Sequence, residues 1–464
     1  MPESSTPPDG QRRKTDFLGR DAIFPLLLKM GLPAAVGMLV NALYNVVDTI
    51  FVGQGVGPLA IAALSIVFPL QTLVSAIAQA MGTGAASIVS RRLGEKRPEE
   101  AASAMGATLA SVLVVNLVLV ALAFAFMEPL LAFFGASPAI MPYALEYTGI
   151  VAAGFFFFSL SLCASNLVRS EGNAKAAMAG MVLGAILNTG LDPLFIFGFG
   201  WGVRGAALAT VLSQAASCLY LLSHYLRGRS HVPLRPRHLR YRPAVLREVA
   251  ALGAPTFVQS AGMSILVLVA NHSLVRYGGD EAVTIYGMIT KFNMIIILPI
   301  IGIVQGFQPI AGYNFGARRF DRVRASITTA IATAFALSLF GYAVIQLAPR
   351  LAMSLFTPDP GLIAKSARDF RIFGLFIPLA AVQIAGSTYF QAVGKPLQAF
   401  FLGISRQFIV LIPLLLVLPR FLGLDGIWIA YPAADLLSSS ITVGVLAREL
   451  RRLGRAASAA GGPA

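Results

Sequence analysis

The apolar residues of this chain lie in long continuous blocks, which limits its possible folds more than any other feature. Several blocks exceed the roughly 20 residues that a membrane-spanning helix needs. Hydrophobic residues make up 56% of the 464 residues and charged residues 12%, about half the charged share of a soluble domain. Membrane barrels instead use strands of about 10 residues with alternating polarity, which this sequence does not contain. The sequence therefore predicts an all-α polytopic membrane protein.

Turn residues and charge clusters divide the apolar sequence into twelve blocks, six in each half of the chain. Each block is long enough to cross a bilayer as one helix. The predicted transmembrane helices cover residues 23–51, 58–90, 101–127, 138–168, 175–198, 203–226, 246–276, 281–311, 322–348, 362–392, 397–419 and 425–447.

Lys and Arg are concentrated in alternate connections between these spans. Of the 36 basic residues, 27 lie on the side of the N-terminus and seven on the opposite side. By the positive-inside rule, both termini are cytoplasmic. The net charge of +15 then follows from topology, so nucleic acid is not an expected partner. We expect a multi-pass protein of the bacterial cytoplasmic (inner) membrane that works as a monomer in the lipid bilayer.

The two halves repeat at an offset of 222 residues, which aligns Gly31-Leu32-Pro33 with Gly253-Ala254-Pro255. Because each half has six spans, the halves are parallel repeats, an architecture of transporters whose substrate path lies between or within two lobes. We predict a disordered cytoplasmic N-terminus, an N-terminal lobe, a cytoplasmic linker, a C-terminal lobe and a cytoplasmic tail. Their respective ranges are 1–20, 21–227, 228–244, 245–450 and 451–464.

Histidines and cysteines give little functional signal. His231 and His238 in the linker have no Cys or acidic residues beside them in sequence, so we interpret this segment as a solvated loop rather than a metal site. Cys163 and Cys218 both lie in apolar blocks. They predict neither a disulfide framework nor a cysteine metal site.

Ionisable residues inside spans are costly in hydrocarbon and are functional candidates by default. Asp48 lies near the outer end of the first span. Asn41 and Tyr44 precede Asp48 at helical spacing and therefore share its face. A polar face on a spanning helix is expected to contact protein or water.

The fifth span carries Asn188 and Asp192 one turn apart, directly before Pro193. Proline inside a helix frees the carbonyl four residues earlier and bends the axis. Two acids, an amide and a freed carbonyl supply the oxygen ligands that a hard cation prefers. From the rise of about 1.5 Å per residue, Asp48, Asp192 and Thr210 all fall in the outer half of the first lobe. The alternative is that each Asp only caps a helix or pairs with a base.

The second lobe has three ionisable residues within its spans. They either neutralise one another or include one that binds substrate. These residues are Lys291, Arg406 and Asp435.

The chain resembles the MATE (multidrug and toxic compound extrusion) family, most of all its DinF-like branch. The resemblance extends from about residue 20 to 450 and is carried by three motifs. These are Tyr44-Asn45-Val46-Val47-Asp48-Thr49, Asn188-Thr189-Gly190-Leu191-Asp192-Pro193 and Gln305-Gly306-Phe307-Gln308-Pro309.

This resemblance implies a two-lobe secondary antiporter that exports amphipathic, mostly cationic small molecules in exchange for H⁺ or Na⁺, without any other cofactor. It implies a cation-coupling site, with Na⁺ as a possible ligand, at Asp48, Asn188, Asp192 and Thr210. It implies a substrate cavity lined by Asn41, Tyr44 and Asn166. NorM-like members have an acid in the seventh span, and this chain has none there.

Two other functions fit the sequence less well. A flippase of a lipid-linked precursor on the same superfold would need several basic residues in its cavity, whereas the first-lobe site is acidic. An intramembrane enzyme would need a catalytic constellation, and neither HExxH nor GxSxG occurs. A Walker motif is also absent. We therefore expect secondary transport and no enzymatic activity.

Overall fold

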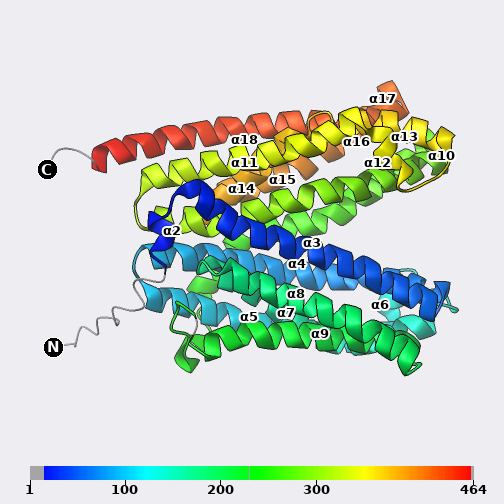
Figure 1. Ribbon diagram of the computed structural model, residues 1–464, viewed down its shortest axis with the longest axis horizontal. Coiled ribbons are helices and arrows are strands. Elements are labelled where there is room, and N and C mark those ends of the chain that lie inside the picture. The colour runs from blue at the N-terminus through cyan, green and yellow to red at the C-terminus, as the bar shows by residue number, and fades with distance from the viewer. Residues whose placement is uncertain (1–14, 229, 461–464) are drawn as a thin grey trace. The chain divides into compact units, whose positions relative to one another are not determined.

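A computed structural model describes residues 15–228 and 230–460, which are helical and contain no strand (Figure 1). The elements of the first half are α2 (Phe17–Arg20), α3 (Ile23–Gly55), α4 (Pro58–Gly94), α5 (Pro98–Ala125), α6 (Met127–Phe133), α7 (Met141–Ser170), α8 (Ala174–Pro193), the π-helix η1 (Leu194–Gly198) and α9 (Gly202–Leu226). The linker and the second half contain the 3₁₀-helix η2 (Pro236–Leu239), α10 (Pro243–Gly316), α11 (Phe320–Leu347), α12 (Pro349–Ser354), α13 (Pro360–Phe373), α14 (Ile377–Ala392), α15 (Pro396–Ile404), the π-helix η3 (Ser405–Leu411), α16 (Ile412–Val417), α17 (Pro419–Leu422) and α18 (Leu424–Ala460).

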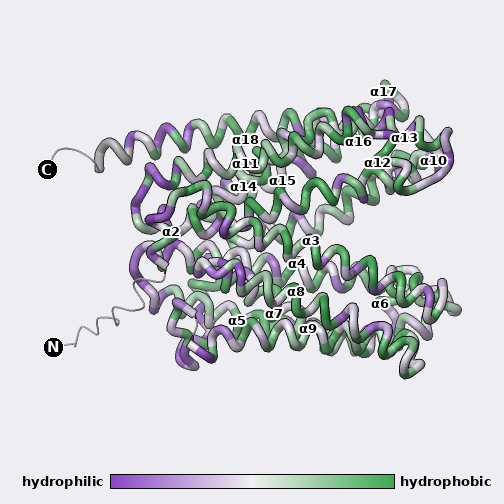
Figure 2. Tube along the Cα trace, viewed as in Figure 1, coloured by the Kyte–Doolittle hydropathy of each residue, from purple (hydrophilic) through white to green (hydrophobic). Residues whose placement is uncertain are grey.

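Ten helical segments within the described ranges are long and apolar enough to cross a membrane, and Figure 2 shows hydrophobic residues along their lengths. One of them, α10, is two helices that meet at Gly279, whose φ of 65° is not helical. Helices α13 and α14, bent by 45° at a short break, together make one further span. The twelve predicted spans are therefore present. Their long apolar sequences are what makes them stable as helices in lipid, where every backbone polar group must be paired within the segment.

The chain divides into two compact units, which we call the first unit (Met1–Arg20 and Val36–Gly253) and the second unit (Asp21–Ala35 and Ala254–Ala464). Residues 21–35, which we predicted in the first lobe, thus belong to the second unit. Close backbone packing explains this difference. A Cβ placed on Gly306 would lie 2.3 Å from the nitrogen of Gly31, and one placed on Gly302 would lie 2.4 Å from the Cα of Ala35. Only glycine permits this approach.

The linker is packed against the first unit, so its interpretation as a solvated loop is wrong at His238. That side chain is buried, and its Nε2 lies 3.0 Å from Oε2 of Glu99 on α5. The Ser230 hydroxyl and the His231 N–H donate to Oε2 of Glu171 at 2.7 and 2.8 Å. The acidic partners that are missing beside the histidines in sequence are supplied by the folded helices.

Glu171 follows the last residue of α7 and lies outside the membrane-spanning segment. Its side chain is completely buried. Burial raises the pKa of Glu171 from 4.5 to about 7, although the donors from Ser230 and His231 act in the opposite direction. Desolvation of the carboxylate therefore outweighs its hydrogen bonds.

The fifth span of each unit changes from α-helix to π-helix part-way along its length. In the first unit the change follows Pro193, where η1 begins, and in the second unit it begins at Ser405 with η3. Such π-helical turns are rare and frequently occur at functional sites. The sequence predicts the break at Pro193 but gives no signal for η3.

The structure covers little of the predicted N-terminus and differs from the prediction at the C-terminal tail. The predicted disordered N-terminus lies mostly outside the described residues, except for 15–20, where α2 forms. At the other end, α18 continues as a helix to Ala460, well past the predicted end of the last span at residue 447. The first part of the predicted tail is therefore helical.

Candidate cation and substrate site

Asp48 and Asp192 meet inside the first unit. Asp48 comes from α3 and Asp192 from the last turn of α8, and both side chains are buried, at 9% and 0% exposure. The two carboxyl groups are adjacent to each other. Two negative charges in contact repel strongly in a buried site. A proton or a cation between these groups removes that repulsion, so the pair is suited to bind one.

Asn188 and Thr210 complete this group of four residues. The Asn188 amide donates to Oδ1 of Asp192 at 3.3 Å and to the Thr210 hydroxyl at 3.5 Å. The first contact follows from the one-turn spacing on α8, while the second brings in α9. The structure thus brings together the four side chains that the resemblance implies as the coupling site.

Three buried oxygens of this group have no hydrogen-bond partner among the described residues: Oδ1 of Asp48, Oδ2 of Asp192 and Oδ1 of Asn188. Buried polar atoms are normally satisfied. Carboxylate and amide oxygens are ligands that Na⁺, as a hard cation, accepts, and a carboxylate also accepts a proton. Within residues 15–228 and 230–460, no group of three His, Cys, Asp or Glu side chains is placed to hold a metal ion. Because the donors at Asp48, Asp192 and Asn188 are all oxygens, they suit a hard cation better than a transition metal that prefers nitrogen or sulfur.

A cavity of about 70 Å³ adjoins these residues within the first unit. Asn188 and Thr210 are part of its lining, so the cation site is next to the cavity. Asn41 and Tyr44, which the resemblance implies as substrate-cavity residues, are among its lining residues, and that this cavity takes substrate stays a prediction. The other lining residues are Phe158, Ser161, Leu162, Ser165, Met181, Gly184, Ala185, Ser213, Gln214 and Ser217.

Asn166, the third predicted cavity residue, is not among the lining residues. Its amide donates to Oε1 of Gln79 at 2.6 Å and to the carbonyl of Leu162 at 3.0 Å. The side chain is buried. Asn166 therefore joins α7 to α4 instead of facing the cavity, because its amide is held by the hydrogen bond to Gln79.

Several polar residues around this site are not among those predicted from the sequence. Tyr147 on α7 hydrogen-bonds to Thr210 and to Gln71, and Ser213 and Gln214 line the cavity. Helical spacing was an available signal, because Ser213 and Gln214 follow Thr210 by three and four residues and so share its face. The signal for Tyr147 was weaker: a tyrosine within a span indicates only that its hydroxyl, if buried, has a hydrogen-bond partner.

The second-unit charges are arranged differently. Nε of Arg406 donates to Oδ1 of Asp435 at 2.6 Å, with Asp435 almost completely buried and Arg406 a quarter exposed. Lys291 is exposed and forms no ion pair with Asp435. Arg406 and Asp435 thus neutralise each other, and Lys291 takes no part in the pair.

Sequence comparison now identifies the family. The profile of the family described as MatE matches residues 33–194 and 255–417, most of the chain. The chain belongs to the MatE family. Among curated relatives, the multidrug export protein MepA of Staphylococcus haemolyticus (strain JCSC1435) is 25% identical over 411 residues, 89% of this chain and 90% of that protein. The MepA protein of Staphylococcus aureus (strain MRSA252) is 24% identical over 413 residues, with the same coverage.

Solved structures of MATE proteins have the same fold. A crystal structure of MATE in complex with MaL6 superposes with a TM-score of 0.89 at 26% identity, over 96% of this chain and 99% of that one. A multidrug resistance MATE family transporter of the MOP superfamily, in an outward-facing conformation, superposes with a TM-score of 0.88 at 26% identity, over 95% and 98%. The predicted MATE resemblance and twelve-helix fold are confirmed. This MatE-family chain is a membrane transporter, not an enzyme; its place in the DinF-like branch stays a prediction.

Proposed function

We propose that this transporter exports amphipathic, mostly cationic drugs in exchange for H⁺ or Na⁺. The observation that carries the proposal is the buried contact between Asp48 and Asp192, with unpaired oxygens, beside a cavity. Within the described residues, the carboxyl pair forms no salt bridge with a base. The pair thus needs either a coupling ion or a cationic compound to neutralise it.

Competition for the same negative charge provides the coupling. With the acids ionised, the site attracts a cationic compound into the adjacent cavity. When H⁺ or Na⁺ binds between Asp48 and Asp192, that attraction disappears and the compound is released. Because the ion and the compound exclude each other, each can drive the other across the membrane by alternating access.

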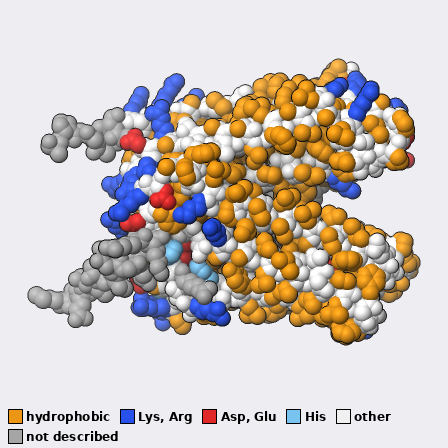
Figure 3. All heavy atoms as spheres, viewed as in Figure 1, with side chains coloured by type: hydrophobic (Ala, Val, Ile, Leu, Met, Phe, Trp, Pro, Cys, Tyr) orange, Lys and Arg blue, Asp and Glu red, His pale blue; other side chains and the backbone are white. Residues whose placement is uncertain are grey.

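The relatives and the charge distribution support this proposal. The MepA relatives are named multidrug export proteins. In the second unit, Figure 3 shows Lys and Arg at both ends, and more of them belong to the end that holds the start of α11 and the end of α18. By the positive-inside rule this distribution favours cytoplasmic termini, and export would then run from the cytoplasm outward. We propose a monomer in the bacterial cytoplasmic membrane.

The polarity of the cavity argues against the flippase alternative. The residues that line the cavity include no Lys or Arg. A substrate with a pyrophosphate group requires such residues, because phosphate is bound chiefly by Arg and Lys. A cationic compound needs only the nearby acids.

Transport by purified protein in liposomes tests the proposal. We expect a fluorescent cation to move when a Na⁺ gradient or, separately, a pH gradient is imposed, and we expect Asp48→Asn to abolish this movement. Asp280→Asn, which changes an exposed aspartate of the second unit, is the matched control and should transport normally. Equal transport by wild type and Asp48→Asn would reject the site. Absence of movement under both gradients, together with lipid scrambling, would favour a flippase.

A further inference from the structure

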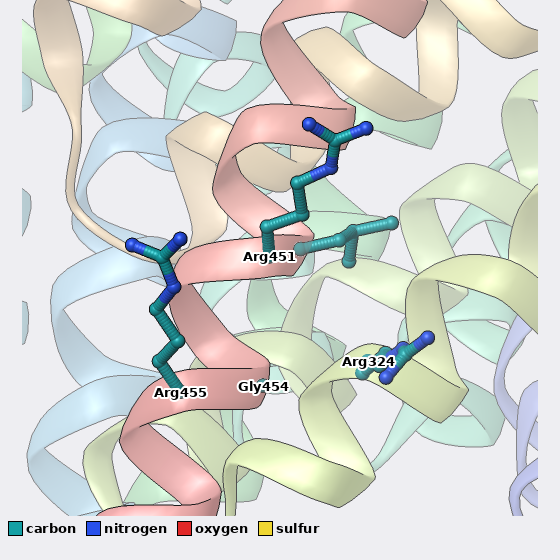
Figure 4. Close-up of a pocket in the computed structure, with 5 residues that line it drawn as sticks. Arg324, Arg451, Gly454 and Arg455 are labelled. Atoms are coloured by element: carbon teal, nitrogen blue, oxygen red, sulfur yellow. The ribbon is translucent and has the colours of Figure 1, made fainter.

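A basic pocket lies between α11 and α18 of the second unit, distant in sequence from the residues discussed above. It has a volume of about 540 Å³ and is lined by Arg324, Leu450, Arg451, Gly454 and Arg455. Figure 4 shows that Arg324 comes from α11 and that the other labelled residues come from α18. No Asp or Glu lines the pocket.

The three arginines lack acidic partners. Among the side chains of residues 15–228 and 230–455, no ion pair or hydrogen bond involves the guanidinium groups of Arg324, Arg451 or Arg455. Other basic residues near this end do have partners: Lys395 binds Glu449, and Arg322 binds Asn314. Three positive charges around one pocket repel one another. An anion in the pocket would remove this repulsion.

Gly454 lies beside Arg324. A Cβ placed on Gly454 would be at an ordinary contact distance of 3.9 Å from Nη1 of Arg324, so a side chain well beyond alanine in size would enter the space of the guanidinium. Arg451 and Arg455 are one turn apart on α18 and share a face. All three arginines line the same pocket, and Figure 4 shows them spread around it, with Arg324 and Arg455 on opposite sides of Gly454.

The pocket lies where two spans end. Arg324 is in the first turns of α11, and Arg455 is the last residue of the α18 span. At such a position the headgroups of the bilayer meet the protein. Leu450 adds an apolar surface to the lining of the pocket. The arginines can bind a phosphate, and the apolar surface can contact an acyl chain. These are the two parts of a phospholipid.

We propose that this pocket binds the phosphate headgroup of an anionic phospholipid. Arginine binds phosphate oxygens through paired N–H donors, and basic pockets between helices on the cytoplasmic side bind doubly charged headgroups. With three arginines, a lipid that carries two phosphates, such as cardiolipin, binds more tightly than phosphatidylglycerol with one. This proposal does not depend on antiport or on the cation site.

Native mass spectrometry of the purified full-length protein tests the proposal. Cardiolipin, phosphatidylglycerol and phosphatidylcholine are titrated separately. From about 1 kcal/mol per basic residue near a membrane surface, we expect Arg324→Gln/Arg451→Gln/Arg455→Gln to weaken cardiolipin binding roughly hundredfold. The control Arg318→Gln/Arg448→Gln/Arg452→Gln removes the same charge outside the pocket and should weaken it far less. Equal losses in the two variants, or equal binding of phosphatidylcholine, would overturn the proposal.

Two further experiments distinguish lipid binding in this pocket from attraction to the total positive charge and from binding of a soluble phosphate. Gly454→Leu keeps every charge but fills the space beside Arg324, and we expect it to weaken cardiolipin binding as well. Unchanged binding in this variant would contradict the geometry. Inorganic diphosphate at equal concentration should not displace the lipid, and displacement would identify a soluble phosphate site instead. Each variant is first checked for an unchanged elution volume and thermal transition.

Discussion

The two units share a plan but carry opposite chemistry at their centres. Each has a π-helix in its fifth span. In the first unit this helix follows Asp192, whose carboxyl group contacts Asp48. In the second unit it contains Arg406, which is paired with Asp435. The repeated glycines and apolar blocks thus specify the fold twice, while a few positions decide whether the centre of a unit holds two acids or an ion pair.

This difference decides which unit can respond to an ion. A buried ion pair is already neutral, so a proton or Na⁺ gains little by entering it. The acid pair is the reverse case, because it stays unneutralised until a cation arrives. We therefore propose that coupling belongs to the first unit and that the Arg406–Asp435 pair has a structural role, and the following predictions test that division.

The largest expected effect is the loss of coupled transport in Asp192→Asn. The amide cannot carry the negative charge that attracts the ion, so gradient-driven export should fall to the level of empty liposomes. The protein should remain folded, because the change removes repulsion between Asp48 and Asp192. Transport and thermal unfolding are measured on the same preparation. Normal coupled export in this variant would remove Asp192 from the site and with it the contrast between the units.

Asp435→Leu should instead destabilise the protein. Removing one partner of a buried ion pair leaves the other charge uncompensated, which costs about 3–5 kcal/mol; we expect the lower end because Arg406 is a quarter exposed. The double variant Arg406→Met/Asp435→Leu should recover most of this loss. Stability is measured by unfolding in denaturant. A stable Asp435→Leu protein that cannot transport would show that the second unit takes part in coupling.

Glu171 extends the comparison to the turn after the fourth span, where the second unit has the ion pair Lys395–Glu449. The pKa of Glu171 is raised from 4.5 to about 7 by burial. Its folded form therefore binds the proton more tightly than the unfolded form. The stability contribution is complete below pH 4.5 and is lost as the pH rises to about 7.

The pH dependence of unfolding measures this contribution. From the size of the pKa shift, wild type should lose about 3 kcal/mol between pH 4.5 and 8 through Glu171. Glu171→Gln cannot ionise and should lack this component, whereas Glu248→Gln, at a partly exposed acid that binds Arg91, should retain it. If wild type and Glu171→Gln have the same pH profile, the carboxylate is not desolvated as the structure indicates.

Much of the fold follows directly from the sequence, because apolar blocks longer than a bilayer is thick have few alternatives to spanning it. Asn188 and Asp192 could also be paired from sequence, since four residues on a helix make one turn. The π-helix η3 could not be predicted from sequence, because a change from α-helical to π-helical backbone hydrogen bonds leaves the hydropathy pattern unchanged. The position of residues 21–35 depends on the fit of Gly31 against Gly306. The orientation of Asn166 depends on its hydrogen bond to Gln79. Both are tertiary contacts without a local signal.

The smallest effect is expected for Thr210→Val, which keeps the side-chain volume but removes the hydroxyl group. That hydroxyl accepts the Asn188 amide at 3.5 Å and also contacts Tyr147. Losing one hydrogen bond of about 1 kcal/mol should weaken ion binding by roughly five- to tenfold, without abolishing transport. The control is Thr108→Val, at a buried threonine of the same unit that bonds only within its own helix. A decrease in affinity confined to Thr210→Val would include α9 in the cation site; equal behaviour of both variants would restrict the site to α3 and α8, with Thr210 only supporting the cavity wall.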